Sequence, residues 1–273
     1  MAYAIADEAI RSTETRTFNG GGCPTEWLLE KVDEAQNIEV LKSFFIYGEL
    51  GHDAIDMVLS GASLDEALEF LWASEEATGY WEKDWIETKN RNKENLLGGL
   101  NAMMYRWAEQ YAEYYDGTFY TDEVELMLDF ETPNGTHVRT RIDALFRTHD
   151  GDRPVLVDWK LGTSKSGKAM QLYVYWYGLK KMGIVTEDDY FRAWFHYVEY
   201  ADPIGLVHEY PGDEIVEAYI DEADRRRKAG PYLPNPEWVS CNYCAYKDDM
   251  CPLYASEPQE TWKYITEVEV YFV

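Results

Sequence analysis

The four cysteines constrain the fold of this chain more than any other feature, because their spacing is typical of one metal-ligand set, with four unrelated buried thiols as the alternative. Three lie near the C-terminus in a C-x2-C-x6-C pattern, at Cys241, Cys244 and Cys251, and the fourth is Cys23 near the N-terminus. In a reducing compartment such thiols bind metal rather than form disulfides, either as a tetrahedral zinc site or as an iron–sulfur cluster. Spacing alone is compatible with both centres. Either one brings the two ends of the chain together.

Composition indicates a folded chain with ample material for a core. Hydrophobic residues make up 46% and aromatic residues 15% of the 273 residues, which excludes an intrinsically disordered protein. No run approaches the ~18 apolar residues that a membrane span requires. The first residues also lack the basic stretch followed by an apolar one that marks a secretory signal. We therefore expect a cytoplasmic protein with no membrane partner.

The charge is strongly acidic but unevenly distributed. A formal net charge of −26 repels nucleic acid at long range. Residues 139–182 nevertheless carry nine basic and four acidic side chains, so this segment is able to attract a polyanion. Residues 63–88 hold eight acids and one lysine. A solvated helix face is the simpler interpretation of that acidic segment, and a surface for a protein partner is the alternative.

The hydrophobic period changes near residue 116. The earlier part has helical patterns at 26–59 and 90–115, and a capping box, Ser63 to Glu66, begins another helix between them. In the later part, alternation and turn residues predict strands at 119–130, 136–148, 154–160, 191–200 and 204–208, with helices at 167–182 and 213–228. This order predicts a mixed α/β (α+β) core preceded by a helical insertion.

Two carboxylates and a lysine form the first candidate site. Asp158 and Lys160 are two residues apart on a predicted strand, so both side chains leave the same face. Asp143 lies on the preceding strand, and hairpin pairing brings it beside Asp158. Paired carboxylates suit Mg²⁺ or Mn²⁺. A nearby lysine can position water or neutralise charge that grows on a phosphate. The D-x-K spacing alone is common on surface strands.

Two helical features extend this set. His52 falls on the apolar face of the helix that ends near Leu59, where a histidine is either a core residue or a nitrogen ligand that points toward a metal. Gln171 and Tyr175 are four residues apart on the helix that follows the Lys160 strand, so they share one face.

Taken in order, these motifs carry a resemblance. The segments 47–52, 141–143, 157–160 and 171–175 read YGELGH, RID, VDWK and QLYVY, and they resemble the ordered motifs of RecB-type nucleases in the PD-(D/E)XK superfamily. The resemblance implies divalent metal bound by His52, Asp143 and Asp158, a catalytic Lys160, and support of the site and the DNA strand by Gln171 and Tyr175. The sequence departs from the family in having Asp158 where Glu is commoner, and Thr140 or Arg141 where a glycine often precedes the first acid.

The cysteines carry a second resemblance. The single Cys23-Pro24 and the later trio ending in Cys251-Pro252 are similar to the one-plus-three arrangement of iron–sulfur RecB-like exonucleases, which include the AddB nuclease domain and CRISPR-associated RecB-like exonucleases. The last spacing is one residue longer than the commoner form. This resemblance implies a 4Fe–4S cluster on Cys23, Cys241, Cys244 and Cys251 that ties the chain ends together around the nuclease core.

The combined motifs predict three segments. Residues 1–116 form a helical region with the first cluster cysteine and the motif histidine, 117–229 form a PD-(D/E)XK nuclease core, and 230–273 form a Cys-rich iron–sulfur segment that packs back on the N-terminal region.

Two functions from different classes fit these motifs. The first is a metal-dependent DNA exonuclease that acts on single strands or DNA ends in recombination, repair or CRISPR-linked or phage DNA processing, in the host cytoplasm if the chain is phage-encoded. The second is a nuclease-like module that binds DNA ends or docks a protein partner with little or no cleavage. The presence of every catalytic residue type favours the enzyme. Trp159, Tyr173 and Trp176 either stack on unpaired bases or fill the core, and at this composition the core is favoured.

Overall fold

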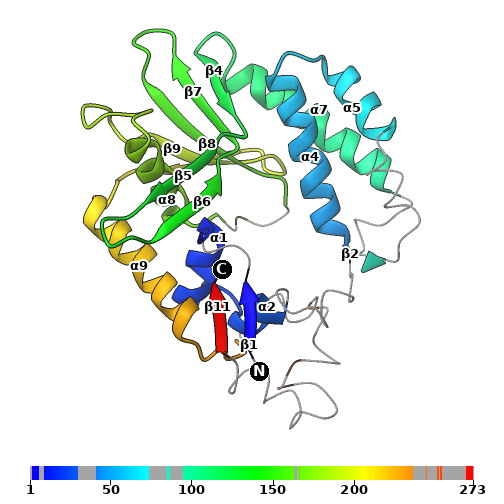
Figure 1. Cartoon of the computed structure of the whole chain (residues 1–273). Helices are drawn as coiled ribbons and strands as arrows, with labels where there is room; N and C mark the ends of the chain where they lie inside the picture. Colours follow the sequence, from blue (N-terminus) through cyan, green and yellow to red (C-terminus); the bar gives the residue numbers. More distant parts are fainter. Residues whose placement is uncertain are drawn as a thin grey trace. The chain divides into compact units, whose positions relative to one another are not determined.

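The computed structural model of the chain describes residues 2–5, 9–29, 41–73, 85–86, 95–162, 165, 167–235, 244, 251, 253 and 269–272. It divides into two compact units, each made of segments that are distant in sequence (Figure 1). The first unit consists of Met1–Val40, Asp129–Thr140 and Pro211–Val273, and the second consists of Leu41–Leu128 and Arg141–Tyr210. The division into three consecutive segments stays a prediction from the sequence.

A five-stranded sheet forms the centre of the second unit (Figure 1). Its order is β10-β9-β8-β7-β4, from Ile204–Val207, Ala193–Tyr197, Pro154–Lys160, Ala144–Thr148 and Phe119–Val124. The central strand β8 pairs antiparallel with β7 and parallel with β9. It is buried from Pro154 to Trp159, and only its last residue, Lys160, is half-buried. A strand covered on both faces is expected to be a continuous apolar run, and the sequence PVLVDW breaks that run only at Asp158.

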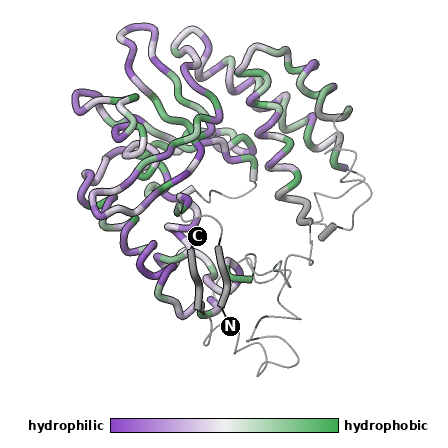
Figure 2. Tube along the Cα trace, in the orientation of Figure 1, coloured by the Kyte–Doolittle hydropathy of each residue, from purple (hydrophilic) through white to green (hydrophobic). Residues whose placement is uncertain are grey.

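Helices of the second unit complete its core. They are α4 (Ser43–Leu59), α5 (Leu64–Ala73), α7 (Leu96–Tyr114) and α8 (Ala169–Lys181), with short strands β2 (Leu41–Lys42) and β3 (Trp85–Ile86). Leu50 of α4 and Trp107 of α7 lie in one buried cluster with Phe146 and Trp159 of the sheet. Hydrophobic and hydrophilic residues alternate along α4, α5 and α7, as amphipathic packing requires (Figure 2). This packing holds α4 at the sheet. In α8 every residue from Val174 to Leu179 is buried.

The capping box predicted at the start of α5 is confirmed. The Ser63 hydroxyl accepts a hydrogen bond from the Glu66 backbone N–H at 3.2 Å, and the Glu66 carboxylate accepts the Ser63 N–H at 2.8 Å. Only part of the acidic segment 63–88 belongs to the described residues. Within α5 the acids Asp65, Glu66 and Glu69 are exposed.

The two long strands predicted at 119–130 and 136–148 are each divided in the structure. The first becomes β4 and β5 (Met127–Glu131), and the second becomes β6 (His137–Arg141) and β7. The turn between β5 and β6 is confirmed as a hairpin turn, because the Thr132 N–H donates to the Thr136 carbonyl at 2.9 Å. The expectation of two uninterrupted strands was wrong, because each predicted strand is interrupted. The first is broken between Val124 and Met127, and the second between Arg141 and Ala144.

The first unit brings together segments from both ends of the sequence. It contains α1 (Ser12–Arg16), the π-helical turn η1 (Thr17–Gly21), α2 (Pro24–Leu29), α9 (Asp213–Ala229), and strands β1 (Ala2–Ile5) and β11 (Glu269–Phe272). β1 and β11 pair in parallel. The fully buried Arg227 of α9 lies 2.7 Å from Asp224 and 3.7 Å from Glu14, and Glu14 also accepts the Trp27 indole N–H at 2.7 Å. This buried network links α1, α2 and α9.

No helix among the described residues has the length and apolar character needed to cross a membrane.

Candidate active site

The bend in two neighbouring strands places two acidic side chains together. Glu125 follows β4 with a φ of 50°, a left-handed conformation that is uncommon for a residue other than glycine. Its N–H donates to the Asp143 carbonyl at 3.0 Å, and the Ile142 N–H donates to the Leu126 carbonyl at 3.1 Å. These hydrogen bonds join the two bends, so Glu125 and Asp143 lie at the same end of the sheet.

The register of β7 and β8 places Asp143 beside the central strand. Ala144 pairs with Val157, so Asp143 reaches the level of Asp158, which is the juxtaposition expected from the sequence. The Asp143 Oδ2 accepts the Trp159 backbone N–H at 2.7 Å. This hydrogen bond fixes the direction of the Asp143 side chain toward β8.

Asp158 is at the centre of a chain of polar contacts. Its Oδ2 lies 2.5 Å from the Lys160 Nζ, and its Oδ1 accepts a hydrogen bond from the Gln171 side-chain amide at 2.8 Å. The same amide nitrogen donates to the Tyr175 hydroxyl at 2.8 Å. The structure therefore links Lys160, Asp158, Gln171 and Tyr175, four of the residues selected from the sequence, in one network.

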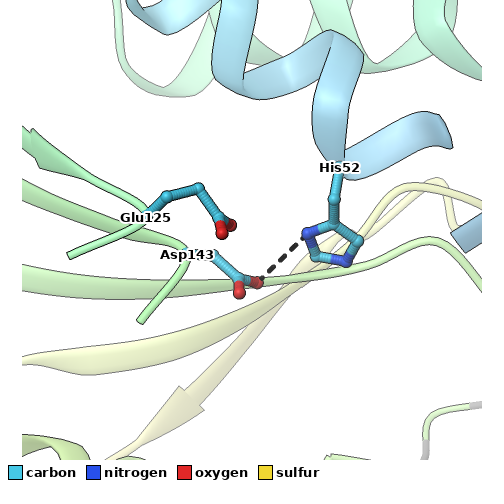
Figure 3. A group of neighbouring side chains, drawn as sticks. All are labelled: His52, Glu125 and Asp143. Atoms are coloured by element: carbon cyan, nitrogen blue, oxygen red, sulfur yellow. Dashed lines mark ion pairs between the residues drawn. The ribbon is translucent and has the colours of Figure 1, made fainter. Parts of the chain in front are cut away.

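Three potential ligands come together beside this network (Figure 3). One donor atom each from His52, Glu125 and Asp143 lie within 4.8 Å of one another. The His52 Nδ1 is 3.6 Å from the Asp143 Oδ2, and the Glu125 carboxylate points toward this pair (Figure 3). Glu125 also forms an ion pair with Arg141, with 2.5 Å between Oε2 and Nε.

The electrostatics of the site follow from its burial and its crowded carboxylates. Burial, followed by repulsion from Asp158, holds the pKa of Asp143 well above its usual value. Burial alone lowers the pKa of Lys160, but the Asp158 and Asp143 carboxylates outweigh it and the net shift is upward. Burial lowers the pKa of His52 and raises that of Glu125. Crowded carboxylates beside a neutral imidazole favour a bound cation.

A comparison with known families decides the class of this site. Residues 15–252 match the PD-(D/E)XK nuclease superfamily. The chain belongs to that superfamily. No curated protein matches the sequence of this nuclease. Among solved structures, one titled "Crystal structure of SSO0001" is 13% identical to it, with a TM-score of 0.39, and the match covers 89% of this chain and 85% of that chain.

The residues of the nuclease site fit a divalent metal ion. Three of the candidate donors are carboxylates, the ligands that Mg²⁺ and Mn²⁺ prefer, and the fourth is an imidazole kept neutral by burial. The Asp158 Oδ2 is buried and faces the Lys160 ammonium at 2.5 Å. A carboxylate oxygen has two lone pairs, so one of them remains for a metal ion beside this ion pair.

Glu125 is the member of the site that the sequence did not reveal. It lies inside the segment 119–130, which we predicted as one strand. The available signal was a shift in the phase of the inward-facing apolar residues, from the odd position Phe119 to the even positions Val124, Leu126 and Leu128. In the sequence alone, Tyr120 and Met127 obscure that shift, because both are apolar but exposed. Such a one-residue shift indicates a bulge, and bulges are frequent beside active sites. The structure has a register shift between Thr121 and Glu123.

The aromatic residues considered for base stacking fill the interior of the nuclease instead. Trp159 and Trp176 are 1% and 2% exposed, so neither presents a face to an unpaired base. Tyr173 is half-buried, and its ring packs against Phe191 with 5.5 Å between centroids. The aromatic ring of Phe195 lies beside Lys160, with 5.3 Å between the ring centroid and the Lys160 Nζ.

Three of the predicted cluster cysteines, Cys23, Cys244 and Cys251, are described by the structure and belong to the first unit. Cys23 is half-buried, and its carbonyl accepts the Trp27 N–H at 3.1 Å at the start of α2. The residues around it are bonded to the segment that leads to the C-terminal cysteines: Thr25 donates to the Tyr232 carbonyl at 2.5 Å, and Asn235 donates to the Gly22 carbonyl at 3.0 Å. Cys244 and Cys251 are half-buried, and Cys241 lies outside the described residues.

Proposed function

We propose that this nuclease is a metal-dependent DNA exonuclease, of the RecB-like type, that degrades single strands or DNA ends in recombination, repair or CRISPR-linked or phage DNA processing. The observation that carries the proposal is a pair of neighbouring contact groups. Asp158 contacts Lys160 and Gln171. Asp143 lies with His52 and Glu125 in one group of potential metal ligands. These are the two components that metal-dependent phosphodiester hydrolysis uses, a metal-ligand set and a fixed cation beside it.

Each side chain has a role in this proposal. Asp143, Asp158, His52 and Glu125 would hold Mg²⁺ or Mn²⁺, which when bound polarises the phosphate and lowers the pKa of water. Lys160 stays protonated at neutral pH because the carboxylates raise its pKa, so its ammonium can stabilise negative charge on the phosphate oxygens. Gln171 fixes the orientation of Asp158 through Oδ1, while Oδ2 faces the Lys160 ammonium.

The choice of a nucleic acid substrate rests on local charge. The site residues Asp143, Asp158 and Lys160 lie within the basic segment 139–182 of an otherwise acidic chain. Basic side chains in that segment can attract phosphates while the remaining surface repels them, which confines the polyanion to one region.

We also propose that Cys23, Cys241, Cys244 and Cys251 hold a 4Fe–4S cluster with a structural role. The hydrogen bonds that join residues 22–25 to residues 232–235 support it. They hold the segment around Cys23 against a segment that ends six residues before Cys241 in the sequence. Phosphodiester hydrolysis transfers no electrons, so the cluster has no redox step to perform in it. Metal–thiolate ligation couples folding to metal binding, which suits a centre that closes the first unit.

The isosteric variants Asp143→Asn and Asp158→Asn test the enzyme. Each removes one carboxylate charge, so metal-dependent cleavage should fall by at least about a thousandfold, as expected for several kcal/mol of lost transition-state stabilisation. The assay uses end-labelled single-stranded DNA with Mn²⁺, and Asp202→Asn, at an exposed position, is the matched control. Circular single-stranded DNA should resist an exonuclease. Near wild-type cleavage by either site variant, or cutting of the circle, would contradict the proposal.

Lys160→Ala separates catalysis from metal binding. An ammonium repels a cation, so its removal should abolish cleavage and leave Mn²⁺ affinity equal or higher by isothermal titration. Loss of Mn²⁺ binding in this variant would show that Lys160 holds the ligands in place and has no direct role in the chemistry.

A further inference from the structure

The second unit contains a pocket at the end of the sheet opposite the nuclease site. Its volume is about 560 Å³, within the size range of small-ligand pockets. It lies where β7 ends, β8 begins and β9 begins, and the side chains that matter for its chemistry are Phe119, His149, Asp150, Arg153, Arg192 and Trp194. We call it the β7–β8 pocket.

The lining of this pocket has a net positive charge, because it holds two arginines, Arg153 and Arg192, and one acid, Asp150. Among the described residues, neither Arg153 nor Arg192 has a carboxylate oxygen within 4.0 Å. Of the acids outside the pocket, Asp122 pairs with Arg147 at 2.6 Å, and Asp152 accepts a hydrogen bond from the Tyr120 hydroxyl. In a chain with a net charge of −26, two arginines beside a cavity that form no ion pair within the described part of the chain are candidates to bind an anionic ligand.

The rest of the lining indicates what kind of anion fits. Phe119 and Trp194 are half-buried, and their rings meet at 5.9 Å in an edge-to-face arrangement, so they offer an aromatic wall. The Trp194 indole N–H is held by the Tyr115 hydroxyl at 2.8 Å, which fixes the position of the ring. Asp150 is exposed at the rim and can accept hydrogen bonds from sugar hydroxyls or base amino groups.

We propose that the β7–β8 pocket binds a nucleoside phosphate, either as a free nucleotide or as the end of a nucleic acid strand. The guanidinium groups of Arg153 and Arg192 would bind the phosphate, since their planar forks match its oxygens. The aromatic wall of Phe119 and Trp194 would contact the base.

This pocket is separate from the nuclease site. Arg153 directly precedes β8 and Lys160 ends it, so about 23 Å of strand lies between them at roughly 3.3 Å per residue. No residue of the pocket lining is among the candidate metal ligands. The proposal therefore stands or fails independently of the proposed cleavage.

Calorimetric titration tests the pocket without the nuclease site. The protein carries Asp158→Asn and the buffer contains EDTA, so metal-held substrate does not contribute. The probes are dAMP, a 5′-phosphorylated oligothymidylate, deoxyadenosine and inorganic phosphate. We expect dAMP, the oligonucleotide or both to bind more tightly than deoxyadenosine and inorganic phosphate. Binding of dAMP alone assigns a free nucleotide, and binding of the oligonucleotide alone assigns a strand end.

Added substitutions locate the bound probe. Arg153→Gln and Arg192→Gln should each weaken binding by about tenfold or more, the loss expected for one charge-assisted hydrogen bond. Arg225→Gln is the matched control, because Arg225 pairs with Glu222 on the exposed face of α9. The proposal is overturned if neither dAMP nor the oligonucleotide binds. It is also overturned if both arginine variants retain full affinity with an unchanged melting temperature, or if inorganic phosphate binds as tightly as the nucleotide probes.

Discussion

The nuclease site and the cysteine region are assembled in opposite ways. Asp143, Asp158 and Gln171 come from one hairpin and the helix that follows it, so strand register and short connections place them. In contrast, Cys23 reaches the C-terminal segment through contacts such as that between Thr25 and Tyr232, which are 207 residues apart. Closing so long a loop carries a larger entropic cost than pairing a hairpin. A site made from local neighbours can form by folding alone, whereas a region made from distant segments benefits from a covalent link.

Cys23→Ser is the strongest way to break this comparison. It removes the residue that, in the proposed 4Fe–4S cluster, would join the N-terminal segment to the later cysteines. If the wild type is brown and contains iron and acid-labile sulfide as proposed, the variant should lose all three. Closure of a loop this long is worth up to about 5 kcal/mol in the loop-entropy model, so the melting temperature should fall clearly. Absorption, iron and sulfide analysis and calorimetry measure the effects.

Two further readouts make the Cys23→Ser result decisive. Ser60→Ala, at an exposed turn, serves as the control and should keep the colour and the melting temperature. Mn²⁺ binding by the fraction of Cys23→Ser that remains folded should be unchanged, since all the candidate ligands belong to the second unit. Colourless wild-type protein with one zinc per chain would show that a zinc ion, rather than an iron–sulfur cluster, links Cys23 to the later cysteines. An unchanged melting temperature would refute the link itself.

The parts of the structure that the sequence predicted well depend on local signals. The strand at 154–160 has the predicted bounds, because an apolar run between a turn and a polar loop has one good interpretation. The breaks at Glu125 and at Ile142–Asp143 were missed because they depend on hydrogen bonds between two strands, which no single strand's pattern contains. The composition favoured burial of Trp159 and Trp176, and both are buried. The sequence could not establish this, because the pattern along one strand or helix does not show what covers each of its faces.

His196 offers a smaller test that is confined to the second unit. It is fully buried on β9, where Nδ1 meets the Tyr115 hydroxyl at 3.0 Å and Nε2 meets the Gln110 amide oxygen at 2.9 Å. Burial lowers the pKa of His196 to about 4, against about 6.5 for an unfolded histidine. The stability from neutral His196 is therefore complete above pH 6.5 and lost as the pH falls from 6.5 toward 4, by about 3 kcal/mol in total.

Urea unfolding at pH 7.5 and pH 5 measures this loss. The wild type should lose more stability between the two pH values than His196→Gln, whatever the absolute stability of the variant. His149→Gln, at an exposed position, should follow the wild type. Equal pH dependence in the wild type and His196→Gln would show that the buried imidazole is not the group that titrates.

Glu125→Gln is the finest probe of how the nuclease site is assembled, because Glu125 was invisible in the sequence and is placed only by the bend. The substitution preserves volume but removes a carboxylate that lies with His52 and Asp143 in the group of potential ligands. Mn²⁺ affinity should fall about tenfold, at the lower end of the range for supporting groups of metal sites. Glu123→Gln, at an exposed position of β4 two residues earlier, is the matched control and should bind Mn²⁺ normally.

Arg141→Gln separates the two roles of Glu125, since it removes the ion pair and leaves the carboxylate. If Arg141→Gln weakens Mn²⁺ binding as much as Glu125→Gln, the ion pair matters for shaping the bend. If only Glu125→Gln has an effect, the carboxylate itself faces the metal, and the phase shift between Phe119 and Val124 becomes a usable sequence signal for a ligand at the following residue.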